Sequence, residues 1–225
     1  MAEQSSVFDM IGPVMIGPSS SHTAGVVRIG RVARKILGKQ PETAEITFYN
    51  SFARTYEGHG SDRAIIAGLM DFKTDDDRIK NAFDHATEVN FSFKFRSVGN
   101  ANTMHPNTVK VVAQHGDRMI EVIGESRGGG VIKITAVNGF GVGFNANLST
   151  MIIMAGDKKG AIAFIATILA NDECNIASMS VNRKGKNDKA CHVIEMDSKP
   201  PQVTIDYLKH LPWINEVIFI PDIDF

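Results

Sequence analysis

The sequence contains little cysteine, no excess of charge and no long apolar run, and each shortage excludes a class of protein. Among 225 residues there are two cysteines, Cys174 and Cys191, which lie 17 positions apart and form no CxxC pair. Two thiols cannot by themselves hold an iron–sulfur cluster or a structural zinc ion, so we expect both to be reduced and buried. No stretch approaches the ~20 apolar residues that a membrane-spanning helix requires.

The charged residues are almost balanced, with 24 Lys and Arg against 25 Asp and Glu and a formal net charge of -1. This balance gives no electrostatic reason to expect nucleic acid or another polyanion as a partner. The four basic residues of RIGRVARK, 28–35, have helical spacing, and we expect them to form a solvated helix face. Since the N-terminal stretch lacks a cationic start followed by an apolar run, we expect a cytoplasmic protein that does not bind membranes.

Several common catalytic signatures are also missing. The sequence has no GxSxG nucleophile elbow, no P-loop, no HExxH and no zinc-finger spacing. The segment GFGVGF, 139–144, resembles a dinucleotide-binding loop only in its glycines, because it does not connect a strand and a helix of a βαβ unit. An autonomous dehydrogenase fragment is therefore the weakest functional hypothesis.

The first part of the chain alternates between helix and strand patterns. Apolar residues recur with helical spacing in the segments 26–37, 60–70 and 75–89. We expect Gly38 to end the first of these helices and Ser61 to be the N-cap of the second. Strands are predicted at 45–49, 90–98, 108–114, 118–126 and 131–137, with turns at 115–117 and 127–130.

The pattern changes after the segment 138–149, which is rich in glycine and asparagine and has neither period. The segments that follow predict a strand, a helix, two strands, a helix and a strand, at 150–156, 160–172, 175–184, 189–197, 200–211 and 214–220. This order places four strands in one antiparallel sheet with both helices on one face, the ferredoxin-like arrangement. We therefore predict an α+β protein with a mixed α/β domain at 1–139, a linker at 140–149 and a ferredoxin-like βαββαβ domain at 150–225.

The stretch GPSSSHTAG, 17–25, carries more polar groups than a helix start needs. A serine before a helix accepts a hydrogen bond from an amide of the first turn, which is worth ~1 kcal/mol, and one serine suffices for that. The free N–H groups of a helix N-terminus also attract carboxylate or phosphate. The three serines, the histidine and the threonine therefore fit either a helix cap or a pocket for a small anion.

Two further stretches place a histidine at the end of an expected element. The segment NANTMHPNT, 100–108, reads either as a polar connection between strands or as a loop that presents His105 and Asn107 to a ligand. In YEGHGSDRA, 56–64, glycines flank His59 and let the backbone approach another group closely. A lone histidine here is more often structural, but three histidines beside hydroxyls or glycines indicate a site.

Together, the stretches IGPSSSHTAG, GHGSDRA and NTMHPNT resemble the β chains of the bacterial iron–sulfur-dependent L-serine dehydratases, also called L-serine deaminases. The resemblance runs over nearly the whole chain, although Ser61 stands where the family would lead us to expect threonine. The N-terminal part resembles the ASB domain, whose fold certain phosphoglycerate dehydrogenases share. The part that begins MAGDKKGAIAF resembles an ACT domain, the small amino-acid-sensing module.

This resemblance implies a lyase subunit that works as a heterodimer with an α chain and is active only with it. The α chain would hold a [4Fe–4S] cluster with one open iron, and this chain would hold no metal. The enzyme would convert L-serine to pyruvate and ammonia, with the open iron acting as a Lewis acid on the serine hydroxyl. Two cysteines cannot build that cluster, which agrees with its placement on a second chain.

The resemblance also assigns roles to residues of this sequence. His22 and His105 are the expected catalytic contacts. The expected substrate-binding residues are Ser19, Ser20, Ser21, Thr23, His59 and Asn107. Which group removes the α-proton stays open. The alternative function is a non-catalytic regulatory module that senses an amino acid.

In an ACT domain, an effector lies where the first strand turns into the first helix, against the sheet of a neighbouring copy. The expected effector-binding residues are therefore Asp157 and Gly160, with Asn175 and Ile176 at the start of the facing strand. The resemblance also allows the chain to pair with a second copy through this domain. ACT domains often pair without binding any ligand, so the pattern leaves effector binding open.

Overall fold

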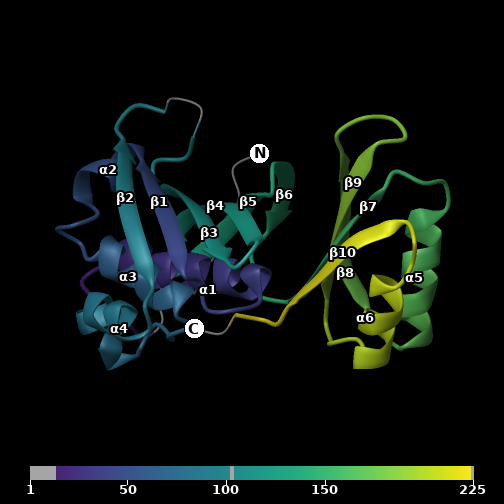
Figure 1. Ribbon diagram of the computed structural model, residues 1–225, viewed down its shortest axis with the longest axis horizontal. Helices are drawn as coiled ribbons and strands as arrows, with labels where there is room; N and C mark the ends of the chain where they lie inside the picture. The colour runs from purple at the N-terminus through teal and green to yellow at the C-terminus, as the bar shows by residue number, and fades with distance from the viewer. Residues whose placement is uncertain (1–13, 102–103, 224–225) are drawn as a thin grey trace. The chain divides into compact units, whose positions relative to one another are not determined.

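Figure 1 shows the computed structural model of the chain, which describes residues 14–101 and 104–223. The chain divides into two compact units, Met1–Asn138 and Gly139–Asp224. No helix among the described residues is long and apolar enough to cross a membrane.

The first unit is a mixed sheet with helices on one face. Its helical elements are the π-helix η2 (Ser20–Ala24), α1 (Gly25–Leu37), α2 (Asn50–Thr55), α3 (Ser61–Leu69), the 3-10 helix η3 (Asp77–Asn81) and α4 (Ala82–Glu88). Its strands are β1 (Thr43–Tyr49), β2 (Ser92–Val98), β3 (Thr108–His115), β4 (Arg118–Gly128) and β5 (Val131–Val137). Together with β6 (Phe140–Phe144), which follows the turn at the unit boundary, they form a sheet in the order β2-β1-β3-β4-β5-β6. Strands β1 and β2 are parallel, whereas β1 with β3, β3 with β4 and β4 with β5 are antiparallel.

Helix α1 packs against β3, β4 and α3 and is the centre of this unit. It ends at Gly38 as predicted, because Gly38 adopts a left-handed φ of 82° and its amide bonds to the Arg34 carbonyl. The two helices touch at glycines: a Cβ on Gly68 would lie 2.2 Å from the carbonyl oxygen of Val27, and one on Gly30 would lie 2.7 Å from that of Ile65. The close approach of α1 to α3 therefore requires both glycines.

The prediction of a solvated basic face on α1 was wrong. Arg28 is 1% exposed, and its Nη1 donates a hydrogen bond of 2.8 Å to the carbonyl of Gly130 in the turn between β4 and β5. Arg31 is also buried and pairs with Asp71, which Lys35 contacts as well. The residues do form a helix, as their spacing predicts, but the guanidinium groups of Arg28 and Arg31 find acceptors inside the unit, which makes their burial tolerable.

Three other differences from the predicted elements have local causes. The helix predicted for 75–89 is a 3-10 turn, η3, followed by α4. The six residues of α2 were not predicted, because they are too few to show a helical period. Part of the predicted linker is the strand β6, in which Phe140 and Phe144 are buried and the intervening glycines are exposed. That alternation has the period of a strand, but the glycines conceal it.

The second unit holds a four-stranded antiparallel sheet with two helices. Its elements after β6 are β7 (Ser149–Gly156), α5 (Ala161–Asn171), β8 (Ile176–Arg183), β9 (Lys189–Met196), α6 (Gln202–Lys209) and β10 (Ile214–Ile220). The strand order is β10-β7-β9-β8, and every neighbouring pair is antiparallel.

Both helices of the second unit lie on the same face of its sheet (Figure 1). The core beneath them joins Met151 and Ile153 of β7 to Ile165 of α5 and Ile205 of α6. Cys174 and Cys191 are both free and buried in this unit, as predicted.

Candidate functional site

The serine-rich stretch forms the start of the α1 helix and caps it. Ser19 is the N-cap of η2: its backbone is extended, and its Oγ accepts a hydrogen bond of 3.3 Å from the amide of His22. The Ser19 carbonyl accepts a bond of 2.8 Å from the Thr23 amide, and that of Ser20 accepts from Gly25. One serine therefore caps the helix, which leaves the hydroxyl of Ser21 for another contact.

That contact is the imidazole of His22. Its Nδ1 lies 2.9 Å from Ser21 Oγ and 3.3 Å from Ser19 Oγ. Burial lowers the pKa of His22, and the nearby His59 lowers it further, so the ring is neutral at pH 7. Its Nε2 is buried without a hydrogen-bond partner among the described residues. Because buried polar atoms rarely stay unpaired, this nitrogen is suited to a ligand or a partner chain.

The stretch 56–64 meets the helix start directly. The ring centroids of His22 and His59 lie 4.7 Å apart. The Oγ of Ser61 donates a hydrogen bond of 2.7 Å to the carbonyl of His22, and the Oγ1 of Thr23 donates one of 3.4 Å to the carbonyl of His59. The Nδ1 of His59 lies 3.2 Å from the Thr55 carbonyl, which can only accept, so this nitrogen carries a proton and donates the bond.

Ser61 is not the N-cap of α3, which corrects the prediction. The N-cap is Gly60, with a left-handed φ of 70°. Ser61 is the first residue of the helix, and its fully buried hydroxyl turns toward the His22 carbonyl instead of its own helix. The side chain that the local pattern predicted to cap the helix makes a tertiary hydrogen bond instead.

The loop that carries His105 reaches the same region through α2. The carbonyl of Pro106 accepts hydrogen bonds from the amides of Ser51 at 2.9 Å and Phe52 at 3.4 Å. The Phe52 ring is buried and meets the His22 ring edge-on, with centroids 4.9 Å apart. Helix α2 therefore connects the His105 loop to His22.

A second connection runs through β4. The Ser126 amide donates a hydrogen bond of 3.0 Å to the Asn107 carbonyl. Ser126 also packs against α1. Its Oγ is so close to Gly25 that a Cβ on that glycine would lie 2.1 Å from the oxygen. The loop before β3 and the start of α1 are thus fixed to the same residue.

His105 is neutral at pH 7, and its tautomer is defined. Burial lowers its pKa, the charge of Arg127 adds to the shift and that of Glu125 opposes it. Its Nδ1 accepts a hydrogen bond of 3.2 Å from the amide of Asn107, so the proton of the neutral ring is on Nε2. Its carbonyl accepts a bond of 2.7 Å from Thr108 Oγ1. His105 therefore offers a hydrogen-bond donor at Nε2.

Sequence reasoning missed the two residues of α2 that join the motifs, Asn50 and Phe52. Asn50 has a left-handed φ of 51°, a conformation that asparagine tolerates better than most residues. The signal was an asparagine directly after a predicted strand, but it gave no indication of which segment its side chain would reach.

The expected effector-binding residues of the second unit do not come together within one copy. Asp157 follows β7 and lies beside the β8–β9 turn, where its carboxylate accepts from the Asn187 amide at 2.9 Å and pairs with Arg183 at 3.3 Å. Gly160 is the N-cap of α5, with a φ of 82°. Asn175 and Ile176 lie at the opposite end of the sheet, where Ile176 is paired with Met196. A site built from all four residues therefore needs a second copy.

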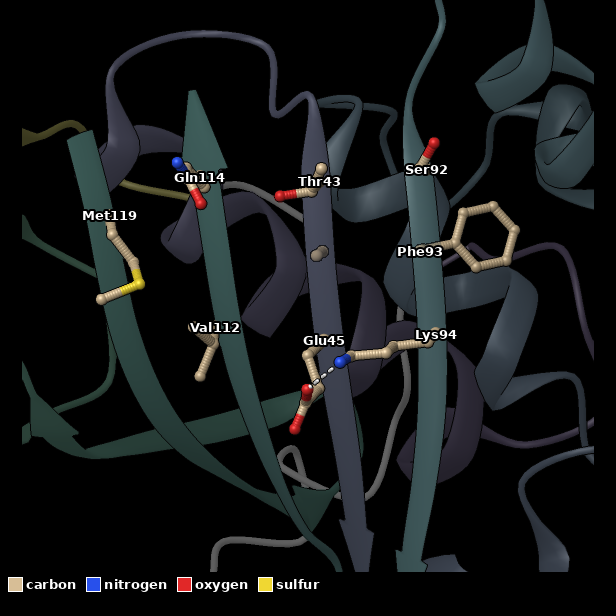
Figure 2. A pocket seen from close by; sticks show the side chains of 9 residues that line it. Thr43, Glu45, Ser92, Phe93, Lys94, Val112, Gln114 and Met119 are labelled. Carbon is tan, nitrogen blue, oxygen red and sulfur yellow. Dashed lines mark ion pairs between the residues drawn. The ribbon is translucent and has the colours of Figure 1, made fainter. Parts of the chain in front are cut away.

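A separate groove of about 400 Å³ lies on the face of the first sheet that is turned away from α1 (Figure 2). Thr43 at the start of β1 and Gln114 near the end of β3 line it, and Lys94 reaches across to Glu45, 2.6 Å away. None of the predicted site residues lines this groove. The histidine cluster lies around the other end of β1, where α2 begins.

The thiols of the chain do not fit a cluster-binding site. Within residues 14–101 and 104–223, no three His, Cys, Asp or Glu side chains are grouped so that they could hold a metal ion. Cys174 and Cys191 are buried in the second unit, and burial raises the pKa of Cys191 to about 11. A metal ligand must be a thiolate, which such an environment disfavours.

Comparisons with known proteins identify the family of this chain. A family model described as the serine dehydratase beta chain matches residues 6–136. The chain is 46% identical over 217 residues to the probable L-serine dehydratase, beta chain, of Bacillus subtilis (strain 168), which covers 96% of this chain and 98% of that protein.

Two further relatives extend the comparison. The chain is 36% identical to the L-serine dehydratase, beta chain, of Peptoniphilus asaccharolyticus, over 85% of this chain and 87% of that protein. It is 31% identical over 91 residues to D-3-phosphoglycerate dehydrogenase 3, chloroplastic, of Arabidopsis thaliana, over 40% of this chain but 16% of that protein. The family model and the two beta chains span most of the sequence, and the chain therefore belongs to the serine dehydratase beta chain family and is an enzyme subunit.

Proposed function

We propose that this chain is the β subunit of a heteromeric L-serine dehydratase, which converts L-serine to pyruvate and ammonia, and that it supplies substrate-binding residues to the active site. One observation carries the proposal: the segments of His22 and His59 meet directly, and the segment of His105 is bonded to the helix α2 that contacts His22. The rings of His22 and His59 are 4.7 Å apart, and Phe52, which contacts His22, also binds the loop that carries His105. The names of the two beta chains that this chain resembles supply the reaction.

The polar groups of this cluster suit an amino-acid zwitterion. L-Serine presents a carboxylate, an ammonium group and a hydroxyl, so its pocket needs both donors and acceptors. The hydroxyls of Ser19 and Ser21 can donate and accept, and the N–H of His105 is a further donor. The neutral state of His22 and His105 avoids burying unpaired positive charge beside the substrate ammonium. Ser20, Thr23 and Asn107 complete the set of substrate-binding residues in this proposal.

The metal centre belongs to the partner in this proposal. The β-chain name implies an α chain, and we assign the [4Fe–4S] cluster to that α chain because the buried thiols here do not suit cluster binding. The role of this chain is then to bind and orient the amino acid, with His22 and His105 as the residues that contact the reacting molecule.

The second unit is proposed to be an ACT domain and the first an ASB-like domain. The strand order β10-β7-β9-β8, with two helices on one face, is that of a ferredoxin-like βαββαβ domain. Its proposed effector site joins Asp157 and Gly160 of one copy to Asn175 and Ile176 of a second copy. Pairing of two copies is part of this proposal, because these two pairs of residues lie at opposite ends of the sheet.

The test is reconstitution with the α chain. The purified chain alone should be colourless and inert, and pyruvate should form from L-serine when the α chain is added. Replacing His22→Ala should lower turnover by about 10²-fold or more without changing co-elution of the two chains on gel filtration. The matched control is His210→Ala, since His210 is exposed at the end of α6.

Two results would contradict the proposal. Normal turnover by the His22→Ala complex would remove His22 from the active site. Tight, stoichiometric binding of L-serine to the isolated chain in calorimetry, with no turnover after the α chain is added, would instead favour an amino-acid-sensing regulatory module.

A further inference from the structure

One short helix, α2, holds the segments of two of the proposed site histidines. Its amides at Ser51 and Phe52 belong to the first turn, where a helix provides no acceptors of its own. Both donate to the carbonyl of Pro106, the residue after His105. The ring centroids of Phe52 and His22 lie 4.9 Å apart. Any movement of the loop relative to α2 would therefore move His105 relative to His22.

Asn50, the first residue of α2, fixes the other side of this loop. Its Nδ2 donates to the carbonyls of Ala101 at 3.0 Å and Met104 at 3.1 Å, and its Oδ1 accepts from the amide of Ala101 at 2.7 Å. Each atom of the amide group is thus matched to a backbone partner, and no other uncharged side chain of similar size supplies both donors and the acceptor. The two carbonyls lie on either side of the chain segment that leads into His105.

The backbone of Asn50 explains how its side chain reaches the loop. Its φ of 51° turns the chain sharply at the end of β1, so that α2 begins at once. Glycine and asparagine adopt this conformation most readily, but glycine would provide no side-chain bonds. The residue is therefore suited to two tasks, the turn itself and the attachment of the loop.

We propose that Asn50 is a positioning residue of the active site, which holds the His105 loop (residues 99–101 and 104–107) in the place that the reaction requires. This proposal rests on the proposed function only for the consequence on turnover. The attachment of the loop by Asn50 is a property of the chain alone, and it can be measured without substrate or partner.

The chain contains a matched control for this residue. Asn138 also has a left-handed φ, 49°, and its Oδ1 accepts a hydrogen bond of 2.9 Å from the amide of Glu121. It lies in the turn after β5, and its side chain bonds to Glu121 of β4 and not to the segments of His22, His59 or His105. Asn50→Gly and Asn138→Gly each keep the backbone conformation and remove the side-chain bonds.

The first measurement is hydrogen exchange of backbone amides in the full-length chain, followed by NMR. In Asn50→Gly the amide of Ala101, which loses its own acceptor, should exchange about tenfold faster than in the wild type. The amides of Met104 and Asn107 should also exchange faster, because the loop that contains them is no longer held by Asn50. In Asn138→Gly these amides should be unchanged, and that of Glu121 should exchange faster instead. Unchanged exchange at Ala101 and Met104 in Asn50→Gly would overturn the proposal.

The second measurement is kcat/KM for L-serine in the complex reconstituted with the α chain. We expect a loss of about tenfold in Asn50→Gly and a larger loss in Asn50→Asp, which places a carboxylate oxygen against the carbonyls of Ala101 and Met104. Asn138→Gly should retain wild-type kcat/KM. If Asn50 were only structural, Asn50→Gly would lower the melting temperature as Asn138→Gly does, and kcat/KM would be unchanged in both variants.

His105→Ala separates a failure of this proposal from a failure of the proposed function. If His105→Ala abolishes turnover while Asn50→Gly exchanges faster and keeps full kcat/KM, the positioning role of Asn50 is wrong. If His105→Ala itself keeps full turnover, the assignment of His105 to the active site is wrong, and the exchange rates alone decide whether Asn50 holds the loop.

Discussion

The imidazole rings of His22 and His59 lie 4.7 Å apart, and a hydrogen bond from Ser61 to the His22 carbonyl holds their segments together. One ring is at a helix start and the other is in the connection between α2 and α3. The His59 ring adds to the lowering of the His22 pKa, and this coupling can be measured.

His59→Gln should raise the pKa of His22. Burial is the main reason that this pKa is low, and His59 adds to the shift, so removal of the second ring should move it back toward its ordinary value of 6.5. The titration of His22 can be followed by NMR of the imidazole nitrogens. A His210→Gln variant is the control, and a His22 titration that is identical in His59→Gln and the control would show that the two rings are not coupled.

The stability of the folded chain should fall as the pH drops below 6.5. Burial lowers the pKa of His22, His105 and His192, so the unfolded chain binds protons more readily than the folded chain in this window. Between the lowered pKa values of the folded chain and 6.5, the free energy of unfolding therefore increases with pH. At lower pH this contribution to stability is lost. Urea unfolding at pH values of about 7.5 and 5.5 measures the change, which should be smaller in His192→Gln. Stability that stays constant or rises toward acid pH would contradict this account.

Gly68→Ala should destabilise the first unit by about 1–3 kcal/mol, because its new methyl group would collide with the Val27 backbone where α1 meets α3. Gly30→Ala should do the same at the Ile65 carbonyl. The matched control is Gly99→Ala, since a Cβ there meets nothing within 4 Å and Gly99 has no left-handed φ. Chemical denaturation gives the three values, and equal stability of all three variants would show that the helices can move apart without cost.

The two cysteines should resist alkylation in the folded chain. Both are buried, and the pKa of Cys191 is raised from 9.0 to about 11, so its thiolate fraction near pH 8 is about 100-fold lower than that of an ordinary thiol. Mass spectrometry after treatment with iodoacetamide should find little modification in the native chain and two modified residues in urea. Rapid labelling of native Cys191 would indicate an exposed or activated thiol and reopen its role as a metal ligand.

Patterns within single segments predicted much of the fold. The period of α1 and its end at Gly38 follow from the spacing of apolar residues and from the left-handed preference of glycine. In β2 and directly before it, the phenylalanines at 91, 93 and 95 are more buried than the polar residues between them, as their alternation indicated. The βαββαβ order of the second unit gave the four-stranded antiparallel sheet with its two helices on one face.

Predictions failed where a contact from another segment decides the outcome. The side chain of Arg28 was expected in solvent and is buried, because the Gly130 carbonyl offers an acceptor 102 positions along the chain. The hydroxyl of Ser61 was expected to cap its own helix and bonds to His22 instead. Neither partner could be inferred from the neighbouring sequence.

The sequence by itself determined where hydroxyls and imidazoles gather at element ends, and this surplus predicted the candidate site. Only the tertiary structure decided that His22 and His59 are neighbours and that Asn50 and Phe52 hold the His105 loop on the helix beside them. The physical reason is the range of the forces: capping and periodicity act within a few residues, whereas ring contacts and hydrogen bonds between segments exist only after the chain has folded.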